Sequence, residues 1–347
     1  MNTELVSTYN KEDIFEKAGQ IIKNGGLVAF PTETVYGLGG DALNKEASRK
    51  IYAAKGRPSD NPLIVHVAEI EAVYKIVKKV DARAEKLMKK FWPGPLTIIF
   101  EKNELVPYET TGGLDTVAIR MPDNECALKF IKAAGGYIAA PSANSSGRPS
   151  PTNASHVLED LGGKIEMIID GGDSSIGVES SIVDVSGDTP ALLRPGFITL
   201  NDLENELGRV IVDPAILGIT EDGVKPKAPG MKYRHYAPKG DMYIVSGACR
   251  EVIDKINQLS EKAKNSGEKV GIIASVENSE EYKNGTVRVI GSLEDEESIA
   301  RHLYAVLREF DTLGTTVIYS EEFNTPTLGM AIMNRLMKAA GKKIINV

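Results

Sequence analysis

A segment rich in proline, lysine and tyrosine interrupts the 347-residue chain and divides it into two folding regions. It runs from Lys225 to Pro238 and carries two tyrosines, one histidine and four basic residues. Proline fixes φ and removes a backbone donor, so we expect an extended connector here. A plain linker is rich in glycine and serine, or acidic. The composition of this one indicates that it packs on an anionic or aromatic surface.

The region before the linker alternates short apolar strands with amphipathic helices. Because strands outnumber helices, we expect an α/β (α+β) domain over residues 1–210, with a twisted mixed sheet and an open cavity. The expected strands cover residues 27–30, 62–67, 96–100, 117–121, 137–140, 166–170 and 181–185, and the expected helices cover residues 11–24, 45–54, two stretches within 69–91, and 124–134.

The region after the linker has the pattern of a small Rossmann-like α/β domain. We place it at residues 240–347, with the extended linker at 211–239. Its expected strands are 242–245, 270–274, 287–290 and 316–319, and its expected helices are 248–264 and 295–310.

Composition and charge exclude several classes of protein. Hydrophobic residues make up 42% and charged residues 26%, as in ordinary globular proteins. No apolar run approaches the roughly 18 residues of a membrane helix, and no signal-peptide core is present. The two cysteines and four histidines predict neither a disulfide framework nor a transition-metal site. We expect a cytoplasmic protein that makes no membrane contact.

The formal net charge of −7 argues against a protein whose main task is to hold nucleic acid. Such proteins present a basic face and gain affinity from counterion release. A local basic groove remains compatible with the sequence, so a non-catalytic RNA-binding module is kept as an alternative. Its test is a filter-binding titration across salt concentrations.

Residues 31–42 contain Gly37-x-Gly39-x-x-Ala42, a loose match to the dinucleotide-binding fingerprint. Five residues, 32–36, lie between Pro31, where the preceding apolar strand ends, and Gly37, so the required strand-to-glycine turn is missing. The P-loop pattern Gly-x-x-x-x-Gly-Lys-Ser/Thr does not occur in the sequence. A nucleotide site in this chain must therefore use another architecture.

Two further motifs place cations where they could bind anions. Lys55-Gly56-Arg57-Pro58 follows a helix and can converge on one polyanion, although a solvated basic helix end is the more common explanation of this motif taken alone. Arg120 ends an apolar strand, where a charge is costly unless paired. It is either half of a buried salt bridge or a fork for a small carboxylate. His66, on another strand, is by itself more typical of a structural histidine.

A loop over residues 141–149 collects hydroxyl, amide and backbone donors after an apolar strand. Such loops bind phosphates or carboxylates, though turns rich in Ser, Asn and Gly are also common. Residues 177–184 begin another strand with hydroxyl side chains, and Arg194 ends a further one. No Ser-His-Asp spacing supports hydrolase chemistry.

Taken together and in this order, these segments resemble the L-threonylcarbamoyladenylate synthase family in its longer, two-domain form. The resemblance covers essentially the whole chain. Ser181 stands where threonine is expected, and a hydroxyl is kept. The matching motifs are residues 31–37, Lys55-x-Arg57-Pro58-x-x-Asn61-Pro62-Leu63, residues 92–97, Ala118-x-Arg120-x-Pro122, Pro141-Ser142-Ala143-Asn144-x-Ser146-Gly147, residues 179–184, and Pro229-Gly230-Met231 through His235-Tyr236-Ala237-Pro238.

The resemblance implies a nucleotidyltransferase that converts L-threonine, bicarbonate and ATP to threonylcarbamoyl-AMP and pyrophosphate. A partner transferase would receive the product, and tRNA would be the final acceptor and not a tight ligand. Mg²⁺ would arrive with ATP and have few protein ligands. A different acyl or carbamoyl transferase is the second alternative, but the zinc fingers or acylphosphatase unit expected of it are missing from this sequence.

The same resemblance implies roles for individual residues, and the linker would close over the site. The catalytic residues would be Lys55, Arg57, Ser142 and Asn144; threonine would be bound by Thr34, His66, Arg120, Ser142 and Ser180; and ATP would be bound by Lys55, Arg57, Asn61, Thr116, Asn144, Thr152, Arg194, His235 and Tyr236.

Overall fold

The computed structural model describes residues 2–8, 13–217, 227–229 and 235–347. Contacts between Cα atoms divide the chain into two compact units. The first comprises residues 1–146, 150–175 and 179–233; the second comprises 147–149, 176–178 and 234–347. Two tripeptides thus belong to the second unit by their contacts, although the chain on either side of each belongs to the first.

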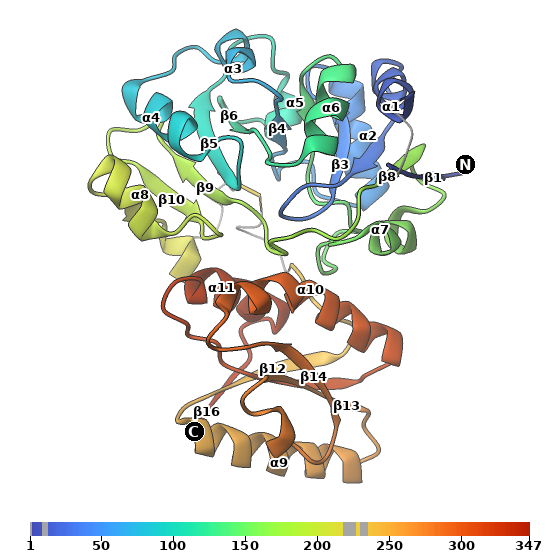
Figure 1. Ribbon diagram of the computed structural model, residues 1–347, viewed down its shortest axis with the longest axis vertical. Helices are drawn as coiled ribbons and strands as arrows, with labels where there is room; N and C mark the ends of the chain where they lie inside the picture. Colours follow the sequence, from blue (N-terminus) through green and yellow to red (C-terminus); the bar gives the residue numbers. More distant parts are fainter. Residues whose placement is uncertain (1, 9–12, 218–226, 230–234) are drawn as a thin grey trace. The chain divides into compact units, whose positions relative to one another are not determined.

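The first unit is built on an eleven-stranded mixed sheet with the order β1-β8-β2-β3-β7-β4-β6-β5-β9-β10-β11 (Figure 1). The strands are β1 (Glu4–Ser7), β2 (Val28–Phe30), β3 (Gly37–Asp41), β4 (Ile64–His66), β5 (Leu96–Glu101), β6 (Thr116–Arg120), β7 (Ile138–Ala139), β8 (Met167–Asp170), β9 (Ser181–Asp184), β10 (Ala191–Arg194) and β11 (Ile211–Val212). The helices are α1 (Asp13–Lys23), α2 (Lys45–Lys55), α3 (Glu71–Ile76), α4 (Ala82–Phe91), α5 (Tyr108–Thr111), α6 (Glu125–Ala133), α7 (Ala154–Leu161), α8 (Leu200–Leu207) and the 3₁₀ helix η1 (Pro214–Leu217).

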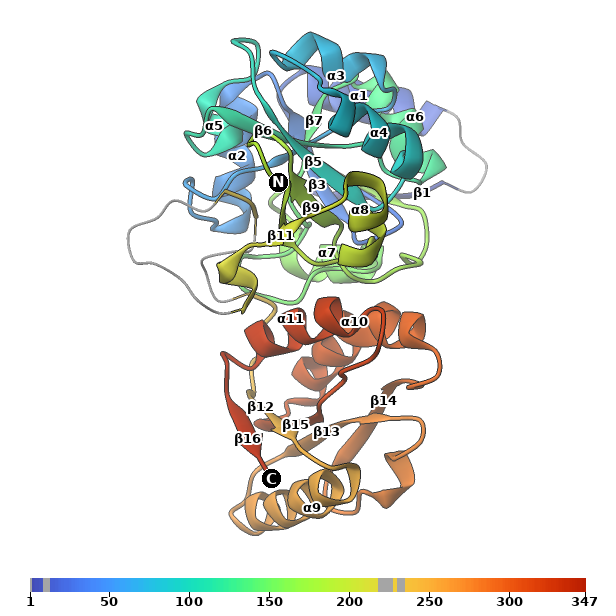
Figure 2. The same ribbon diagram turned by 90° about the vertical axis from the view of Figure 1, so that its left-hand side faces the viewer.

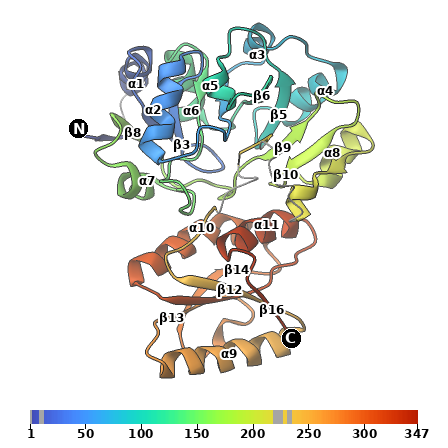
Figure 3. The ribbon, with the colours of Figure 1, turned by 180° about the vertical axis from the view of Figure 1, so that it is seen from behind.

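The sheet has an apolar core on each of its two faces, and successive side chains along a strand enter the two cores in turn. In β2, Val28 and Phe30 pack with α1 and α6, whereas Ala29 packs with the core that includes α2, α4 and α7. This is the two-residue period of a strand buried on both sides. Seen from behind, α1 and β8 lie toward one end of the sheet and β9, β10 and α8 toward the other (Figure 3).

The sheet register places four polar side chains in one transverse row. His66 on β4 is paired with Arg120 on β6, Arg120 with Thr97 on β5, Thr97 with Ile182 on β9, and Ile182 with Arg194 on β10. Residues directly opposite each other on neighbouring strands project to the same face. Five consecutive strands therefore present His66, Arg120, Thr97 and Arg194 on a single side of the sheet.

A register shift between Leu192 and Arg194 brings the last of these side chains onto that side. A bulge of this kind re-aims the residue that follows it. Leu193 packs against Ile64, Ile99, Ala118 and Ile182, which belong to the same face. Ala228, from the described part of the linker, packs in this cluster and is fully buried. Ala228 thus lies against the face that carries the polar row.

The second unit is a five-stranded parallel sheet with the order β14-β13-β15-β12-β16. Helix α9 lies on one face, and α10 and α11 lie on the other (Figure 2). Its elements are β12 (Asp241–Ser246), α9 (Cys249–Asn265), β13 (Val270–Ser275), the 3₁₀ helix η2 (Ser279–Glu281), β14 (Thr286–Gly291), α10 (Glu296–Leu313), β15 (Val317–Glu321), α11 (Gly329–Ala339) and β16 (Ile344–Asn346).

The α/β class expected from the sequence, with a mixed sheet and a smaller α/β domain, is confirmed. The expected cavity and domain boundaries stay predictions, and residues 218–226 and 230–234 of the expected linker lie outside the described residues. The structure adds elements that the sequence patterns missed, among them β3, α7, α8 and α11. Within the described ranges, no helix is both long and apolar enough to cross a membrane.

Candidate functional site

Arg120 lies at the centre of a buried polar cluster. Its side chain is almost fully enclosed, and Nη2 lies 2.7 Å from Glu33 Oε1. Nη1 donates to Thr34 Oγ1 at 2.8 Å, and Nε donates to the Gly94 carbonyl at 3.3 Å. A buried guanidinium needs such partners, because desolvation of an unpaired charge costs several kcal/mol. The buried salt bridge that the sequence left open is therefore present.

The hydroxyl of Thr34 is oriented by its neighbours in the loop between β2 and β3. Thr32 Oγ1 donates to the Val35 carbonyl at 2.6 Å and lies 2.9 Å from Thr34 Oγ1. A hydroxyl has one hydrogen to donate, so Thr34 is the donor between the two threonines. Thr34 then accepts from Arg120. The chain of bonds fixes the loop against the row on the sheet.

His66 is buried beside Arg120. Its Nδ1 lies 3.2 Å from the Ile64 carbonyl, and its ring meets Phe30 edge-on with 6.0 Å between centroids. Burial lowers the pKa of His66 to about 3, and the charge of Arg120 adds to the effect. The ring is therefore neutral at physiological pH and can serve as a hydrogen-bonding group but not as a cation.

Ser180 connects the other half of the row. Arg194 Nη2 donates to Ser180 Oγ at 3.0 Å, and Arg194 Nε donates to the Ser180 carbonyl at 2.9 Å. Thr97 Oγ1 lies 2.8 Å from Ser180 Oγ. The sequence analysis assigned Ser180 to threonine and Arg194 to the nucleotide, and the structure places the two in direct contact.

Lys55 and the loop of residues 142–146 form a second cluster. Lys55, the last residue of α2, donates from Nζ to the carbonyls of Ser142 and Asn144. Ser142 Oγ donates to Asn144 Oδ1 at 2.5 Å, and the Ser146 amide donates to the Lys55 carbonyl at 2.8 Å. Gly56 follows with φ of 61°, a left-handed conformation that suits glycine and ends the helix there. The sequence elements 55–57 and 141–147 are thus brought together.

The segment from Thr32 to Gly37 touches both clusters. Glu33 and Thr34 contact Arg120, while the Tyr36 carbonyl accepts from the Ala143 amide at 2.8 Å and Gly37 forms a bridge with Ser142. Predicted carboxylate-binding and phosphate-binding groups therefore lie at opposite ends of one short, buried loop.

Arg57 and Asn61 occupy the loop that leads into β4. Arg57 donates from Nε to the Asn61 carbonyl at 3.3 Å and from Nη2 to the Pro62 carbonyl at 3.1 Å. Asn61 is 2% exposed, and its Oδ1 accepts no hydrogen bond from any residue that the structure describes. Buried polar atoms are nearly always bonded, so this acceptor is suited to a donor supplied by a ligand.

The remaining predicted residues are placed less centrally. Thr116 is paired with Glu101 at the opposite end of β6 from Arg120. Thr152 is buried and lies beside His156, 3.5 Å from Oγ1 to Nδ1. Tyr236 is buried in the second unit with φ of 64°. The His235 ring lies 5.5 Å from that of Tyr236. The roles assigned to all four stay predictions.

Two functional candidates were not assigned roles from the sequence. Glu33 pairs with Arg120, and Thr97 bonds to Ser180. An isolated acid just after an apolar strand was the available signal for Glu33. Thr97 ends the motif of residues 92–97, but no role was assigned to it, and the register and its contact with Ser180 place it in the row.

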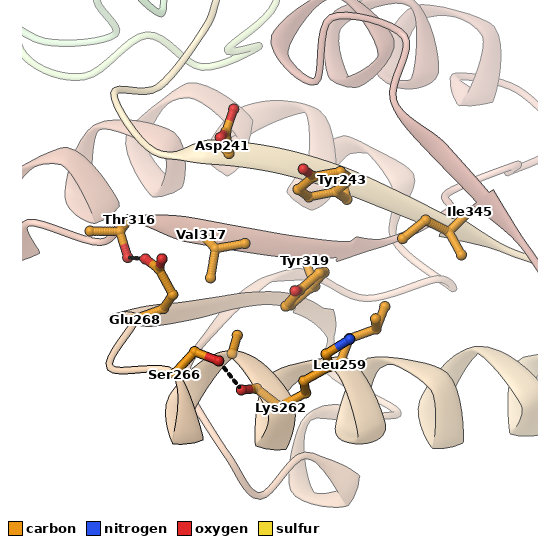
Figure 4. A pocket seen from close by; sticks show the side chains of 11 residues that line it. Asp241, Tyr243, Leu259, Lys262, Ser266, Glu268, Thr316, Val317, Tyr319 and Ile345 are labelled. Carbon is orange, nitrogen blue, oxygen red and sulfur yellow. Dashed lines mark hydrogen bonds between the residues drawn. The ribbon is translucent and has the colours of Figure 1, made fainter.

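A separate hollow lies in the second unit and has a volume of about 490 Å³ (Figure 4). Tyr243 and Tyr319 line it with 5.9 Å between ring centroids, together with Glu268, which accepts a hydrogen bond from Thr316. None of the residues predicted to bind threonine or ATP lines this hollow.

Comparison with known proteins places the chain in a family. Residues 20–196 match the family model described as "Telomere recombination", and residues 198–341 match the model "Threonylcarbamoyl-AMP synthase, C-terminal domain". A threonylcarbamoyl-AMP synthase of Pyrococcus abyssi is 50% identical and is aligned over 95% of each chain. The chain belongs to the threonylcarbamoyl-AMP synthase family. The relative in Bacillus subtilis is 46% identical over 95% of this chain and 93% of its own length.

Solved structures of this synthase family agree in fold. The structure of P. abyssi Sua5 complexed with L-threonine has a TM-score of 0.93, with 47% identity over the full length of both chains. A structure of a double variant of the same protein has a TM-score of 0.94 and covers 99% of this chain and 98% of its own. The expected family and its two-domain form are confirmed.

The depressed pKa of His66 predicts a pH-dependent stability. In the unfolded chain His66 regains an ordinary pKa of about 6.5, so between that value and about 3 only the unfolded state binds the proton. The contribution of His66 to the unfolding free energy therefore falls as pH is lowered through this window, by up to about 1.4 kcal/mol per pH unit.

Urea unfolding at pH 7, 6 and 5 measures the effect. As the pH falls from 7 to 5, the free energy of unfolding of the wild type should decrease more than that of His66→Gln. His302→Gln, at an exposed site, is the control for loss of an imidazole elsewhere. Parallel stability curves for the wild type and His66→Gln would contradict the prediction.

Proposed function

We propose that the two clusters of the first unit form the site at which the chain makes threonylcarbamoyl-AMP. The activity is that of its family: L-threonine, bicarbonate and ATP give threonylcarbamoyl-AMP and pyrophosphate for the threonylcarbamoyladenosine modification of tRNA. The observation that carries the site assignment is the buried row on five strands, with the loop of residues 32–37 joining it to Lys55 and Ser142.

The row is the proposed site for threonine. Arg120 contacts Glu33 through Nη2 and Thr34 through Nη1, and an incoming carboxylate can replace Glu33 at Nη2. Neutral His66 and the Ser180 hydroxyl, which is oriented by Arg194, supply uncharged polar partners. These groups suit a small amino acid with one carboxylate and a hydroxyl side chain.

The loops around Lys55 and Arg57 are the proposed site for ATP. Lys55 holds the loop of residues 142–146 by its carbonyls, so the Ser142 hydroxyl and Asn144 amide are fixed where a reacting carbamate and α-phosphate would meet. Arg57 brings a second cation to the same region for the leaving pyrophosphate. The buried, unbonded Oδ1 of Asn61 is suited to an amino or hydroxyl group of the nucleotide.

The proposed reaction has two steps. The threonine amine attacks the carbon of bicarbonate, and water leaves as the carbamate forms. A carbamate oxygen then attacks the α-phosphorus; the P–O bond to the β-phosphate breaks, and pyrophosphate departs with the bonding electrons. The contribution of the protein is positioning and electrostatic stabilisation of the developing charge.

Mg²⁺ is proposed to arrive with ATP. Within the described part of the chain, no group of three or more His, Cys, Asp or Glu side chains could hold a metal ion. Cations and neutral donors surround the proposed phosphate region, which fits an ion held mainly by phosphates and water. When bound, Mg²⁺ would neutralise phosphate charge. Cytoplasmic location and transfer of the product to a partner transferase are further parts of the proposal.

A pyrophosphate-release assay tests the substrate set. Release from ATP should require both L-threonine and bicarbonate, because the carbamate is the nucleophile. Each component is left out in turn, with carbonate-free buffer for the second case. Undiminished release without threonine would contradict the proposal.

Arg57→Ala should lower the rate of pyrophosphate release by about 10²–10³, the usual effect of removing one preorganised charged donor. Arg49→Ala is the matched control: Arg49 is an exposed residue of the preceding helix, paired with Glu46, and its loss should leave the rate nearly unchanged. Equal rates for the two variants would remove Arg57 from the phosphate site.

Variants of the adjacent residues Ser180 and Ser181 distinguish an effect on threonine binding from an effect on stability. Ser180→Ala should raise the KM for threonine about tenfold, as expected for loss of one hydrogen bond in a dry site. Ser181 Oγ donates to the Ile198 carbonyl at 2.5 Å, so Ser181→Ala should lower thermal stability and leave that KM unchanged. Steady-state kinetics and thermal unfolding of both variants give the comparison; a reversed pattern would contradict it.

A further inference from the structure

Helix α10 of the second unit has two distinct faces. Ile299, Leu303, Leu307 and Phe310 form a buried apolar stripe, and Phe310 lies so close to Gly271 of β13 that a Cβ there would clash with its ring. A second set, Arg301, Tyr304, Arg308 and Asp311, recurs at offsets of 3, 7 and 10 residues and therefore shares the other face. We call this set the loop-facing stripe.

The C-terminal half of the loop-facing stripe, Arg308 and Asp311, contacts residues 147–149. Arg308, which is 3% exposed, donates from Nη2 to the Pro149 carbonyl at 2.6 Å. Asp311 Oδ2 lies 3.4 Å from Arg148 Nη2, and its Oδ1 accepts from the Lys239 amide at 2.6 Å. The Ala237 amide donates to the Gly147 carbonyl at 2.9 Å. The end of the linker and this tripeptide are thus bound to the same carboxylate and to each other.

The N-terminal half of the loop-facing stripe, Arg301 and Tyr304, contacts Gly177 and Tyr236. A Cβ on Gly177 would lie 2.4 Å from Arg301 Cα and 2.6 Å from the Ala300 carbonyl oxygen, so only glycine fits there. The Tyr236 ring packs on Tyr304 with 5.1 Å between centroids. Tyr236 has φ of 64°, which is uncommon for a bulky residue and needs support from its surroundings.

Each segment held by α10 continues directly into a proposed site residue. Residues 147–149 follow the loop that contains Ser142 and Asn144. Residues 176–178 precede Glu179 and Ser180, and Tyr236 follows His235. By their contacts both tripeptides belong to the second unit, although the chain around them belongs to the first. A backbone anchored within a few residues of a binding group restricts where that group can lie.

We propose that the loop-facing stripe of α10 positions the loops of the synthase that contain Ser180 and Asn144, through the backbone at Arg301 and the side chains of Arg308 and Asp311. The inference rests on the proposed function, because it assigns Ser180 to threonine and Asn144 to the nucleotide. The contacts at Gly177 restrain the loop that leads to Ser180, which is the proposed threonine ligand. The hydrogen bond from Arg308 to Pro149 restrains the loop that contains Asn144, which is the proposed nucleotide ligand.

This arrangement predicts crossed effects on the two substrates. Gly177→Ala displaces residues 176–178 from α10, so the KM for threonine should rise about tenfold or more while the KM for ATP changes little. Arg308→Met removes the donor to Pro149, so the KM for ATP should rise instead. Arg308→Lys keeps a donor and should restore much of the loss.

Matched controls separate positioning from stability. Gly267 also has φ of +85° but no atom within 4 Å of its Cβ position, so Gly267→Ala carries the same backbone strain without the clash. Full-length variants are compared by pyrophosphate release at varied threonine and ATP, and by thermal unfolding. Gly177→Ala should unfold at a lower temperature than Gly267→Ala because of the clash, and it alone should raise the KM for threonine while the KM for ATP changes little.

The outcomes are distinct. Unequal effects on the two KM values in the directions stated support the positioning role. The positioning role is contradicted if both KM values change equally and follow the loss of thermal stability. It is also contradicted if Gly177→Ala has the same kinetics as Gly267→Ala. If Ser180→Ala leaves the KM for threonine unchanged, the threonine assignment fails, and the positioning role is then judged by kcat/KM of Gly177→Ala against Gly267→Ala alone.

Discussion

The ion pair between Arg120 and Glu33 is the interaction on which the site depends. Both side chains are enclosed by the sheet and its loops, and their charged atoms are 2.7 Å apart. Breaking a buried pair by removing one partner is strongly destabilising, typically by about 3–5 kcal/mol. A substrate carboxylate that takes the place of Glu33 at Arg120 keeps the guanidinium paired. In the proposed site, the guanidinium of Arg120 would therefore exchange one carboxylate partner for another.

The sheet places the other polar side chains of the row beside Arg120 without the need to order a flexible loop. Because His66, Thr97 and Arg194 lie in the same transverse row, their separation is fixed by strand spacing and not by flexible loops. The bulge before Arg194 completes the row. The loop of residues 32–37 then connects the row to Lys55 and Ser142, so two clusters with different chemistry share one buried support.

The sequence was informative where chemistry is concentrated in short motifs. The charge of Arg120 at the end of an apolar strand predicted a buried pair or a carboxylate fork, and the pair is present. Lys55 and the loop of residues 142–146 were placed in separate motifs, and the structure brings them into contact. Strands with strong apolar patterns, such as β5 and β6, were predicted to within one residue at each end.

Other features depend on contacts between distant parts of the chain and left little signal. Strand β3 reads Gly-Leu-Gly-Gly-Asp and has few strand-favouring residues; Gly39 is required there because a Cβ would lie 2.9 Å from Ile138. The loop-facing stripe of α10 was missed because its apolar stripe alone explains the helix. Glu33 could be matched with Arg120 only once the loop and the strand were placed side by side.

Calorimetric binding of L-threonine and of L-threoninamide to the full-length protein tests the central claim most directly. The two ligands differ at the carboxylate that Arg120 is proposed to bind. Loss of one partner of a buried charged pair costs about 2–5 kcal/mol, so threoninamide should bind at least about thirtyfold more weakly. Equal affinity for the two ligands would show that Arg120 does not bind the carboxylate and would contradict the site described for threonine.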